Sequence, residues 1–159
     1  MKRLLTILLT VLLGAAVASA QRFSVRVVGI SDGDTFSVIN QDKLQLKIRV
    51  YGIDAPEKGQ DFGNKAKQAL SDLIMGKDIQ IDVQSRDSWG RLISYVYTPD
   101  GRDVSLLMLQ EGMAWHFVKY DGTEQYAQAE KKARAKKIGL WSQLNPTAPW
   151  DFRGSKRGK

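Results

Sequence analysis

The sequence of 159 residues contains no cysteine and a single histidine, His116. Zinc sites built from cysteine and histidine are therefore excluded, and so are a catalytic cysteine and an acid–base pair of two histidines. A Ser-His-Asp triad would have to use His116, which lies between Trp115 and Phe117 and outside any catalytic motif, so we predict a structural role for it. Any catalysis must then rely on carboxylates, arginines and a metal ion that prefers oxygen ligands.

The longest apolar run lies near the N-terminus, from Leu4 to Val17, and follows the basic residues Lys2 and Arg3. The small residues 18–20, Ala-Ser-Ala, come next and match the pattern that a signal peptidase cuts. An uncleaved membrane anchor is the alternative, but a transmembrane helix needs about 20 apolar residues, and no basic flank follows this run. The sequence therefore predicts a signal peptide at residues 1–20 and an exported protein, periplasmic or secreted, without stable membrane association.

The remaining chain has the length of one domain and an excess of basic residues. Removal of residues 1–20 lowers the formal net charge from +7 to +5, which still favours polyanions such as nucleic acid or anionic lipid. Residues 21–145 are predicted to form a single domain, and we expect a monomer. Residues 146–159 are rich in proline, glycine and basic residues and predict a loosely docked or disordered tail.

Alternation of apolar and polar residues predicts five short strands, at residues 23–30, 35–39, 44–51, 79–83 and 91–97. In the third of these, Arg49 falls on the face opposite the apolar stripe that includes Ile48 and Val50. Apolar spacing of three and four predicts helices at residues 62–75, 104–113 and 123–138. Asp103 is expected to cap the second helix. The third helix carries basic residues on one side, which indicates either a solvated face or a surface that steers phosphate.

This order of elements predicts an α+β, mainly β fold. Five short strands with a helix after the third suggest a five-stranded Greek-key β-barrel of the oligonucleotide/oligosaccharide-binding (OB) type, with three packed α-helices. Such a fold does not by itself establish a function, because many activities use the same barrel.

Three short polar segments, at residues 32–35, 49–57 and 87–91, contain groups that the fold does not require. Taken singly, each has a structural explanation: a tight turn, a loop that opens a helix, and a hairpin connection. Together they supply the groups that phosphodiester hydrolysis needs, namely oxygen ligands for a cation, a carboxylate for water, and guanidinium donors for the transition state. The joint occurrence of the segments therefore indicates a phosphodiesterase.

The motifs also resemble those of a known family. The sequence has Asp-Gly-Asp-Thr at residues 32–35, Arg-x-x-x-Ile-Asp-Ala-Pro-Glu at 49–57, Asp-x-x-Gly-Arg at 87–91 and Gly-Leu-Trp at 139–141. This combination resembles the staphylococcal nuclease-like (thermonuclease) family, and the resemblance extends from about Ser24 to Ser142. The loop at residues 58–61 is shorter than in the best-known member.

The resemblance implies a Ca²⁺ site. Asp34 and Asp54 would bind the ion through their carboxylates and Ala55 through its backbone carbonyl, where many relatives have threonine. Ca²⁺ takes about 6–8 oxygen ligands, so these three would leave room for water and phosphate. Judged by oxygen ligands alone, Mg²⁺ or Mn²⁺ would also be accepted.

The resemblance also implies the catalytic residues. Glu57 would position or deprotonate the attacking water, while Arg49 and Arg91 would bind the scissile phosphate. The products of such nucleases end in 3′-phosphates. Trp89 and Tyr120 match family positions that stack on bases. The predicted function is Ca²⁺-dependent, endonucleolytic cleavage of DNA, RNA or both.

Two alternatives remain beside the nuclease. The barrel could be a catalytically inactive nucleic-acid-binding module, although such relatives usually lack one or more of the charged positions present here. A cationic envelope or lipid-binding protein is the second alternative, since the positive charge suits anionic lipid as well as nucleic acid.

Overall fold

The alternating strands close into a barrel. The computed structural model describes residues 21–157, so the predicted signal peptide at residues 1–20 lies outside the described residues. The barrel consists of β1 (Arg22–Ile30), β2 (Thr35–Ile39), β3 (Gln45–Val50), β5 (Asp78–Arg86) and β6 (Leu92–Tyr97). Its order is β1-β2-β3-β6-β5, with β5 returning to β1, and β3 pairs with β6 in parallel while the other pairs are antiparallel. The five-stranded barrel prediction is confirmed.

The barrel interior is filled by every second residue of the strands. Ile48 and Val50 of β3 are buried, as the sequence pattern predicts. The other strands contribute branched and aromatic side chains in the same way: Val25, Val27, Phe36, Val38, Ile79, Ile81 and Val96. Because successive side chains of a strand point to opposite faces, the polar residues between these positions face outward. Arg49 is one of them.

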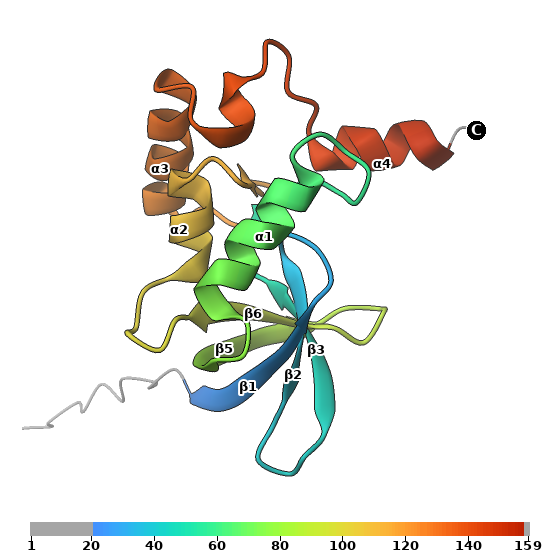
Figure 1. Cartoon of the computed structure of the whole chain (residues 1–159), viewed down its shortest axis with the longest axis vertical. Coiled ribbons are helices and arrows are strands. Elements are labelled where there is room, and N and C mark those ends of the chain that lie inside the picture. The colour runs from blue at the N-terminus through green and yellow to red at the C-terminus, as the bar shows by residue number, and fades with distance from the viewer. Residues whose placement is uncertain (1–20, 158–159) are drawn as a thin grey trace, which may run out of the picture.

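Three helices lie together at one end of the barrel (Figure 1). They are α1 (Gly63–Ile74), α2 (Val104–Gln110) and α3 (Glu124–Ala135). Helix α1 buries Ala66, Leu70 and Ile74 in the core that the barrel interior also joins. Asp103 caps α2 as predicted, because its side chain accepts a hydrogen bond of 3.2 Å from the backbone N–H of Leu106. The basic side chains of α3 are exposed to solvent.

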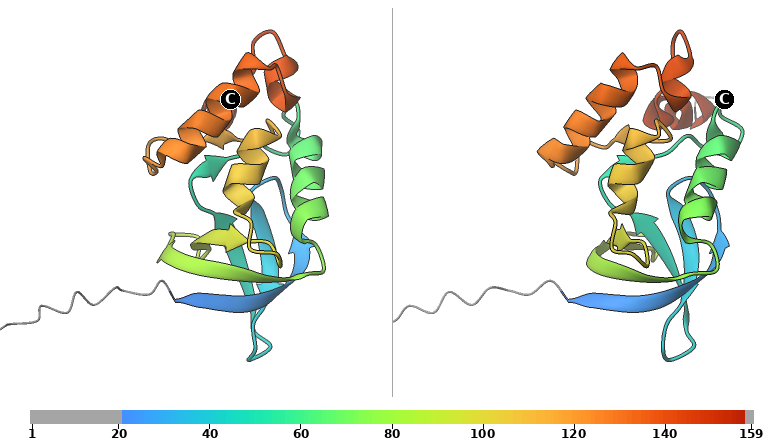
Figure 2. Two further views of the ribbon diagram at one scale, coloured as in Figure 1. Left: turned by 90° about the vertical axis from the view of Figure 1, so that its left-hand side faces the viewer. Right: turned by 60° about the vertical axis from the view of Figure 1, so that its left-hand side comes forward.

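The C-terminal segment differs from the predicted loose tail. After the 3₁₀ turn η1 (Gly139–Ser142), which belongs to the predicted domain, residues 146–159 contain a fourth helix, α4 (Pro149–Arg157), which lies beside the loop before α1 (Figures 1 and 2). The ring of Trp150 stacks on Phe117, with centroids 5.6 Å apart, and meets the edge of Trp115 at 5.5 Å. In addition, Gln60 Nε2 donates a hydrogen bond of 2.7 Å to the carbonyl of Thr147. Aromatic packing therefore docks a segment whose composition predicts a loosely docked or disordered tail.

A short two-stranded ladder connects the barrel to the C-terminal half of the chain. It is formed by β4 (Ile53–Asp54) and β7 (Trp115–His116), and it pairs Asp54 with Trp115. The ladder thus brings a polar residue of the second motif next to the aromatic residues that hold α4. Among residues 21–157, no helix has the length and apolar character needed to cross a membrane.

Candidate active site

The turn between β1 and β2 places Asp34 beside the end of the second motif. A side chain at Gly33 would bring a Cβ within 2.7 Å of the side chains of Ala55 and Ala66, so only glycine permits this close approach. The carboxylate of Asp34 is buried and accepts a hydrogen bond of 2.9 Å from the backbone N–H of Ala55. Asp32 accepts a bond of 3.1 Å from the backbone N–H of Asp34. The predicted metal ligands Asp34 and Ala55 are therefore in direct contact.

The turn after β3 needs glycine for a second reason. Gly52 has a φ of +78°, and a Cβ there would lie 2.8 Å from the ring of Tyr126. Its carbonyl accepts a hydrogen bond of 2.9 Å from the backbone N–H of Phe117. Left-handed backbone and close ring packing together let the chain turn from β3 into β4 and bring Asp54 back beside Arg49.

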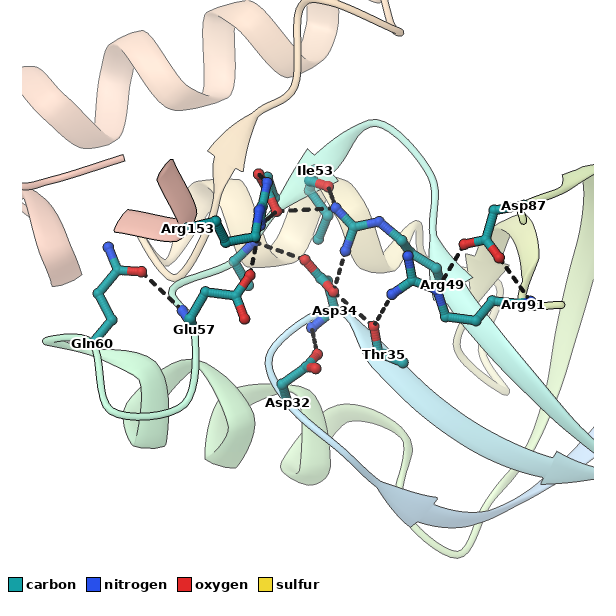
Figure 3. A network of polar contacts seen from close by, with 12 residues as sticks. Asp32, Asp34, Thr35, Arg49, Ile53, Glu57, Gln60, Asp87, Arg91 and Arg153 are labelled. Carbon is teal, nitrogen blue, oxygen red and sulfur yellow. Dashed lines mark hydrogen bonds and ion pairs between the residues drawn. The ribbon is translucent and has the colours of Figure 1, made fainter. Parts of the chain in front are cut away.

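Arg49 connects the two buried carboxylates. Its guanidinium forms an ion pair with Asp34, donates from Nη2 to Asp54 Oδ1 at 3.0 Å, and reaches the carbonyl of Ile53 at 3.3 Å (Figure 3). The side chain of Arg49 is 13% exposed, and those of Asp34 and Asp54 are 5% and 0% exposed. Buried carboxylates are stable only when paired and hydrogen-bonded, so Arg49 makes this cluster possible.

These contacts give neighbouring carboxyl groups different pKa values. Burial would raise the pKa of Asp34, but the charge of Arg49 and the N–H of Ala55 hold it below its ordinary range. The pKa of Asp32 is raised to about 6, first by burial and then by the negative charge of Asp34. For Arg49, burial opposes the charged form, yet the two partner carboxylates raise its pKa further. Asp34 is therefore an anion across the physiological pH range.

Glu57 lies further along the acidic loop and is more accessible, with 34% of its side chain exposed. Its backbone N–H donates a hydrogen bond of 3.0 Å to Gln60 Oε1, which fixes the start of the short loop before α1. Both Glu57 and Asp54 contact the same guanidinium, that of Arg153 in α4 (Figure 3). Glu57 is thereby joined to the cluster around Arg49.

Arg153 is a site residue that the sequence analysis missed. Its Nη1 lies 2.6 Å from Glu57 Oε1 and 3.1 Å from Asp54 Oδ1, and its Nη2 lies 2.7 Å from Asp54 Oδ2. Because the residue belongs to the segment predicted as a tail, its charge carried no information about position. One signal was present: Trp150 and Phe152 are aromatic residues of a kind that disordered segments rarely contain.

Arg91 lies at the edge of the same cluster. It enters β6 directly after the hairpin turn, and its Nε donates to Asp87 Oδ2 at 2.7 Å. A long contact of 3.5 Å joins its Nη1 to Thr35 Oγ1, which in turn donates to Asp34 Oδ1 at 2.9 Å. The structure thus joins all the predicted catalytic and metal-binding residues in one network, which Arg91 reaches through Thr35 (Figure 3).

A comparison of the sequence with known protein families agrees with the arrangement of these site residues. Residues 47–143, more than half of the chain, match the family described as staphylococcal nuclease homologue. The chain belongs to the staphylococcal nuclease family. The resemblance seen in its motifs is therefore confirmed, and the OB-type barrel is the fold of that family.

Named relatives are similar over much of their length. A protein of Haemophilus influenzae named "Uncharacterized endonuclease" is 38% identical over 156 residues, covering 98% of this chain and 87% of the relative. The "Micrococcal nuclease" of Shigella flexneri is 38% identical, covering 85% and 83% respectively. The "Staphylococcal-like nuclease CAN1" of Arabidopsis thaliana is 39% identical, but the match covers 72% of this chain and only 35% of the relative.

The residues of this staphylococcal nuclease family site suit a hard cation. Within residues 21–157, no group of three or more histidine, cysteine, aspartate or glutamate side chains is arranged as a ready metal cluster. Instead, Asp54 and Glu57 already hold a cation, the guanidinium of Arg153. Carboxylate oxygens that hold one cation at 2.6–2.7 Å are also the ligands that Ca²⁺ prefers. The carboxylates are therefore of the kind that a hard cation such as Ca²⁺ or Mg²⁺ accepts.

The two aromatic residues predicted to contact substrate are both on the surface. Trp89 is 76% exposed at the hairpin tip, with the guanidinium carbon of Arg91 5.3 Å from its ring centroid. Tyr120 is 62% exposed, and its carbonyl accepts a hydrogen bond of 2.8 Å from Tyr51. Both rings are therefore accessible to a base.

The only histidine is away from solvent. His116 is 5% exposed, and its Nε2 lies 2.7 Å from a carboxylate oxygen of the buried residue Asp121. Within the described part of the chain, no serine hydroxyl is hydrogen-bonded to this ring. These contacts agree with the structural role that the sequence indicates for His116.

Proposed function

We propose that this protein is a Ca²⁺-dependent nuclease that hydrolyses phosphodiester bonds within DNA, RNA or both and leaves 3′-phosphate ends. Membership of the staphylococcal nuclease family supports nuclease activity. The observation that carries the proposal is the buried pair Asp34 and Asp54 held by Arg49, with the more accessible Glu57 beside it. These groups match the three needs of phosphodiester hydrolysis: a cation site, a base for water, and donors for phosphate.

In the proposed reaction, Asp34, Asp54 and the carbonyl of Ala55 would hold Ca²⁺, which when bound would supply positive charge against the scissile phosphate. Two carboxylates and one carbonyl would fill at most half of the about 6–8 oxygen positions of Ca²⁺, so water and phosphate oxygens could complete the set.

Glu57 receives the proton of the attacking water. The water oxygen then forms a bond to phosphorus while the bond between phosphorus and the 5′ oxygen breaks, so the phosphate stays on the 3′ side. The partial exposure of Glu57 agrees with this role, because a base must be reachable by water and substrate.

Arg49 and Arg91 bind the equatorial phosphate oxygens through their planar forks, and Arg91 assists the departing 5′ oxygen. Lysine cannot replace either residue fully, because a single ammonium cannot make two parallel hydrogen bonds to phosphate. Arg91 is suited to this role by its position: Asp87 orients it, and 23% of its side chain remains exposed.

We also propose that the protein is exported, on the basis of the sequence pattern of residues 1–20. Mass spectrometry of the protein purified from its host tests the export step. Cleavage after Ala20 leaves Gln21 as the first residue, and a full-length mass would contradict it.

The activity is tested with the exported form, residues 21–159. Plasmid DNA, single-stranded DNA and RNA are incubated with micromolar protein, with Ca²⁺ or with a chelator, and the product ends are identified. We expect cleavage only with Ca²⁺ and 3′-phosphate ends. Intact nucleic acid in the Ca²⁺ samples would contradict the enzyme. Retention of intact DNA in a gel-shift assay would then favour the inactive binding module.

A further inference from the structure

The guanidinium of Arg153 covers two carboxylates that the proposed nuclease needs for its reaction. Both oxygens of Asp54 are engaged: Oδ1 by Arg49 and Arg153, at 3.0 and 3.1 Å, and Oδ2 by Arg153 at 2.7 Å. The third contact, at 2.6 Å, is to Glu57 Oε1 (Figure 3). A metal ligand and the general base are thus bound to a cation supplied by the protein's own C-terminal helix.

The two arginines on Asp54 are held differently. Arg49 is 13% exposed and also forms an ion pair with Asp34, whereas Arg153 is 34% exposed and has its carboxylate contacts only at the outer side of the cluster. The three carboxylates Asp34, Asp54 and Glu57 exceed these two guanidiniums by one negative charge, so the cluster favours a further cation. Of the two guanidiniums, Arg153 is therefore the one that an incoming cation can replace.

Helix α4, which contains Arg153, packs on the surface partly through a side chain that is itself exposed. Trp150 stacks on Phe117 and meets Trp115 but is itself 36% exposed. The chain leading to α4 borders a cleft of about 220 Å³ against the loop that contains Gln60. Among the described side chains, none of α4 belongs to the core that fills the barrel, so displacement of the helix would leave that core intact.

Gln60 connects this attachment to the acidic loop. Its Oε1 accepts from the backbone N–H of Glu57, and its Nε2 donates to the carbonyl of Thr147, just before α4. A shift of the C-terminal segment is therefore transmitted to the backbone that carries Glu57 as well as to its side chain.

We propose that Arg153 is an intramolecular competitor of Ca²⁺, and that α4 releases Asp54 and Glu57 when the ion binds. This rests on the proposed function, because it concerns the same metal site. Without metal, the guanidinium keeps the buried carboxylate satisfied and the site closed. Ca²⁺ binds the open form, so the apparent dissociation constant exceeds the intrinsic one by the inverse of the open fraction.

Calorimetric titration of Ca²⁺ without nucleic acid tests the competition. A partly exposed guanidinium of this kind leaves about 15–30% of molecules open, so Arg153→Ala should lower the dissociation constant about threefold to sixfold. Arg26→Ala is the control, since it removes one arginine from an ion pair on the surface, with Asp78 at 2.8 Å. Its dissociation constant should stay within about twofold of the wild type, because that pair involves no site residue.

A second variant separates release of the helix from loss of a positive charge. Trp150→Ala keeps Arg153 but removes the ring that attaches α4, so it should also tighten Ca²⁺ binding. In the wild type, Ca²⁺ should increase the hydrogen exchange of backbone amides in residues 149–157. An unchanged dissociation constant for Trp150→Ala, together with unchanged exchange, would overturn the release of α4.

The outcomes also distinguish this inference from the proposed function. Equal dissociation constants for wild type and Arg153→Ala would overturn the competition while the Ca²⁺ site stands. Absence of Ca²⁺ binding in the wild type and in all three variants would overturn both.

Discussion

Two regions of the molecule present an arginine to the same carboxylate, and the comparison separates a structural cation from a displaceable one. Arg49 comes from the barrel strand β3, which is paired on both edges, and it joins two buried aspartates. Arg153 comes from α4, near the end of the chain, and contacts Asp54 from the more exposed side. The contact of Arg49 with Asp54 thus stabilises the fold, whereas the contact of Arg153 with Asp54 controls access to the site.

Arg49→Ala should have the largest effect on this comparison. It leaves Asp34 and Asp54 buried without their common partner, and breaking a buried pair in this way destabilises a protein by about 3–5 kcal/mol. Arg153→Ala should lower the free energy of unfolding by about 1 kcal/mol or less, because its pair is partly solvated. Urea denaturation measures both, and similar losses would contradict the distinction.

Glu57→Gln should abolish activity without affecting the fold. Loss of the base should lower kcat about 10²–10³-fold, while the free energy of unfolding changes by about 0.5 kcal/mol or less. Glu124→Gln on α3 is the matched control, since it removes one exposed carboxylate, which accepts a hydrogen bond from Gln128 and lies outside the site. Its kcat should equal that of the wild type; retained activity in Glu57→Gln would remove Glu57 from the mechanism.

Trp150→Ala should loosen α4 alone. Aromatic pairs contribute about 0.5–1.5 kcal/mol beyond their buried area, so we expect a loss of about 1–2 kcal/mol in the local stability of this helix. Hydrogen exchange should become fast at residues 149–157 and stay slow in β3 and β6. Equal acceleration in the barrel strands would show that α4 belongs to the cooperative core.

Asp87→Asn should have the smallest effect, and the effect should depend on pH. Burial opposes ionisation of Asp87, but hydrogen bonds from Arg91 lower its pKa in the folded protein. A lowered folded pKa adds stability above the unfolded value, about 3.9, and this stability disappears as pH falls through the folded pKa. The variant should therefore lose about 0.5 kcal/mol at pH 7 and less at pH 3, which lies below the unfolded pKa. Denaturation at the two pH values checks this, and an equal loss at both would contradict it.

The parts of the structure that the sequence predicts well depend on near neighbours. The period of two around Ile48 and Val50 indicates a strand with one buried face, and Asp103 before an apolar helix indicates a cap. Both were correct because the pattern and the structure that it produces involve residues only a few positions apart. The positions of Asp34, Arg49 and Asp54 in turns and at strand ends follow from the same local patterns.

The fourth helix and its arginine could not be predicted in this way. Arg153 and Asp54 are 99 residues apart in sequence, and nothing in the neighbourhood of either indicates the other. Composition favoured a loosely docked or disordered C-terminal segment. Trp150 nevertheless packs against the rings of Trp115 and Phe117, which lie together only in the folded protein. Tertiary packing therefore overrode the local signal.

The sequence by itself determined the barrel, the three helices packed on it and the family motifs, because periodicity, caps and turn residues act over short distances. Only the tertiary structure decided which cations lie on which carboxylates. Burial of Asp34 and Asp54 requires a compensating charge, and the fold supplies one from the barrel and a second from α4. The closed state of the site is therefore a property of long-range packing.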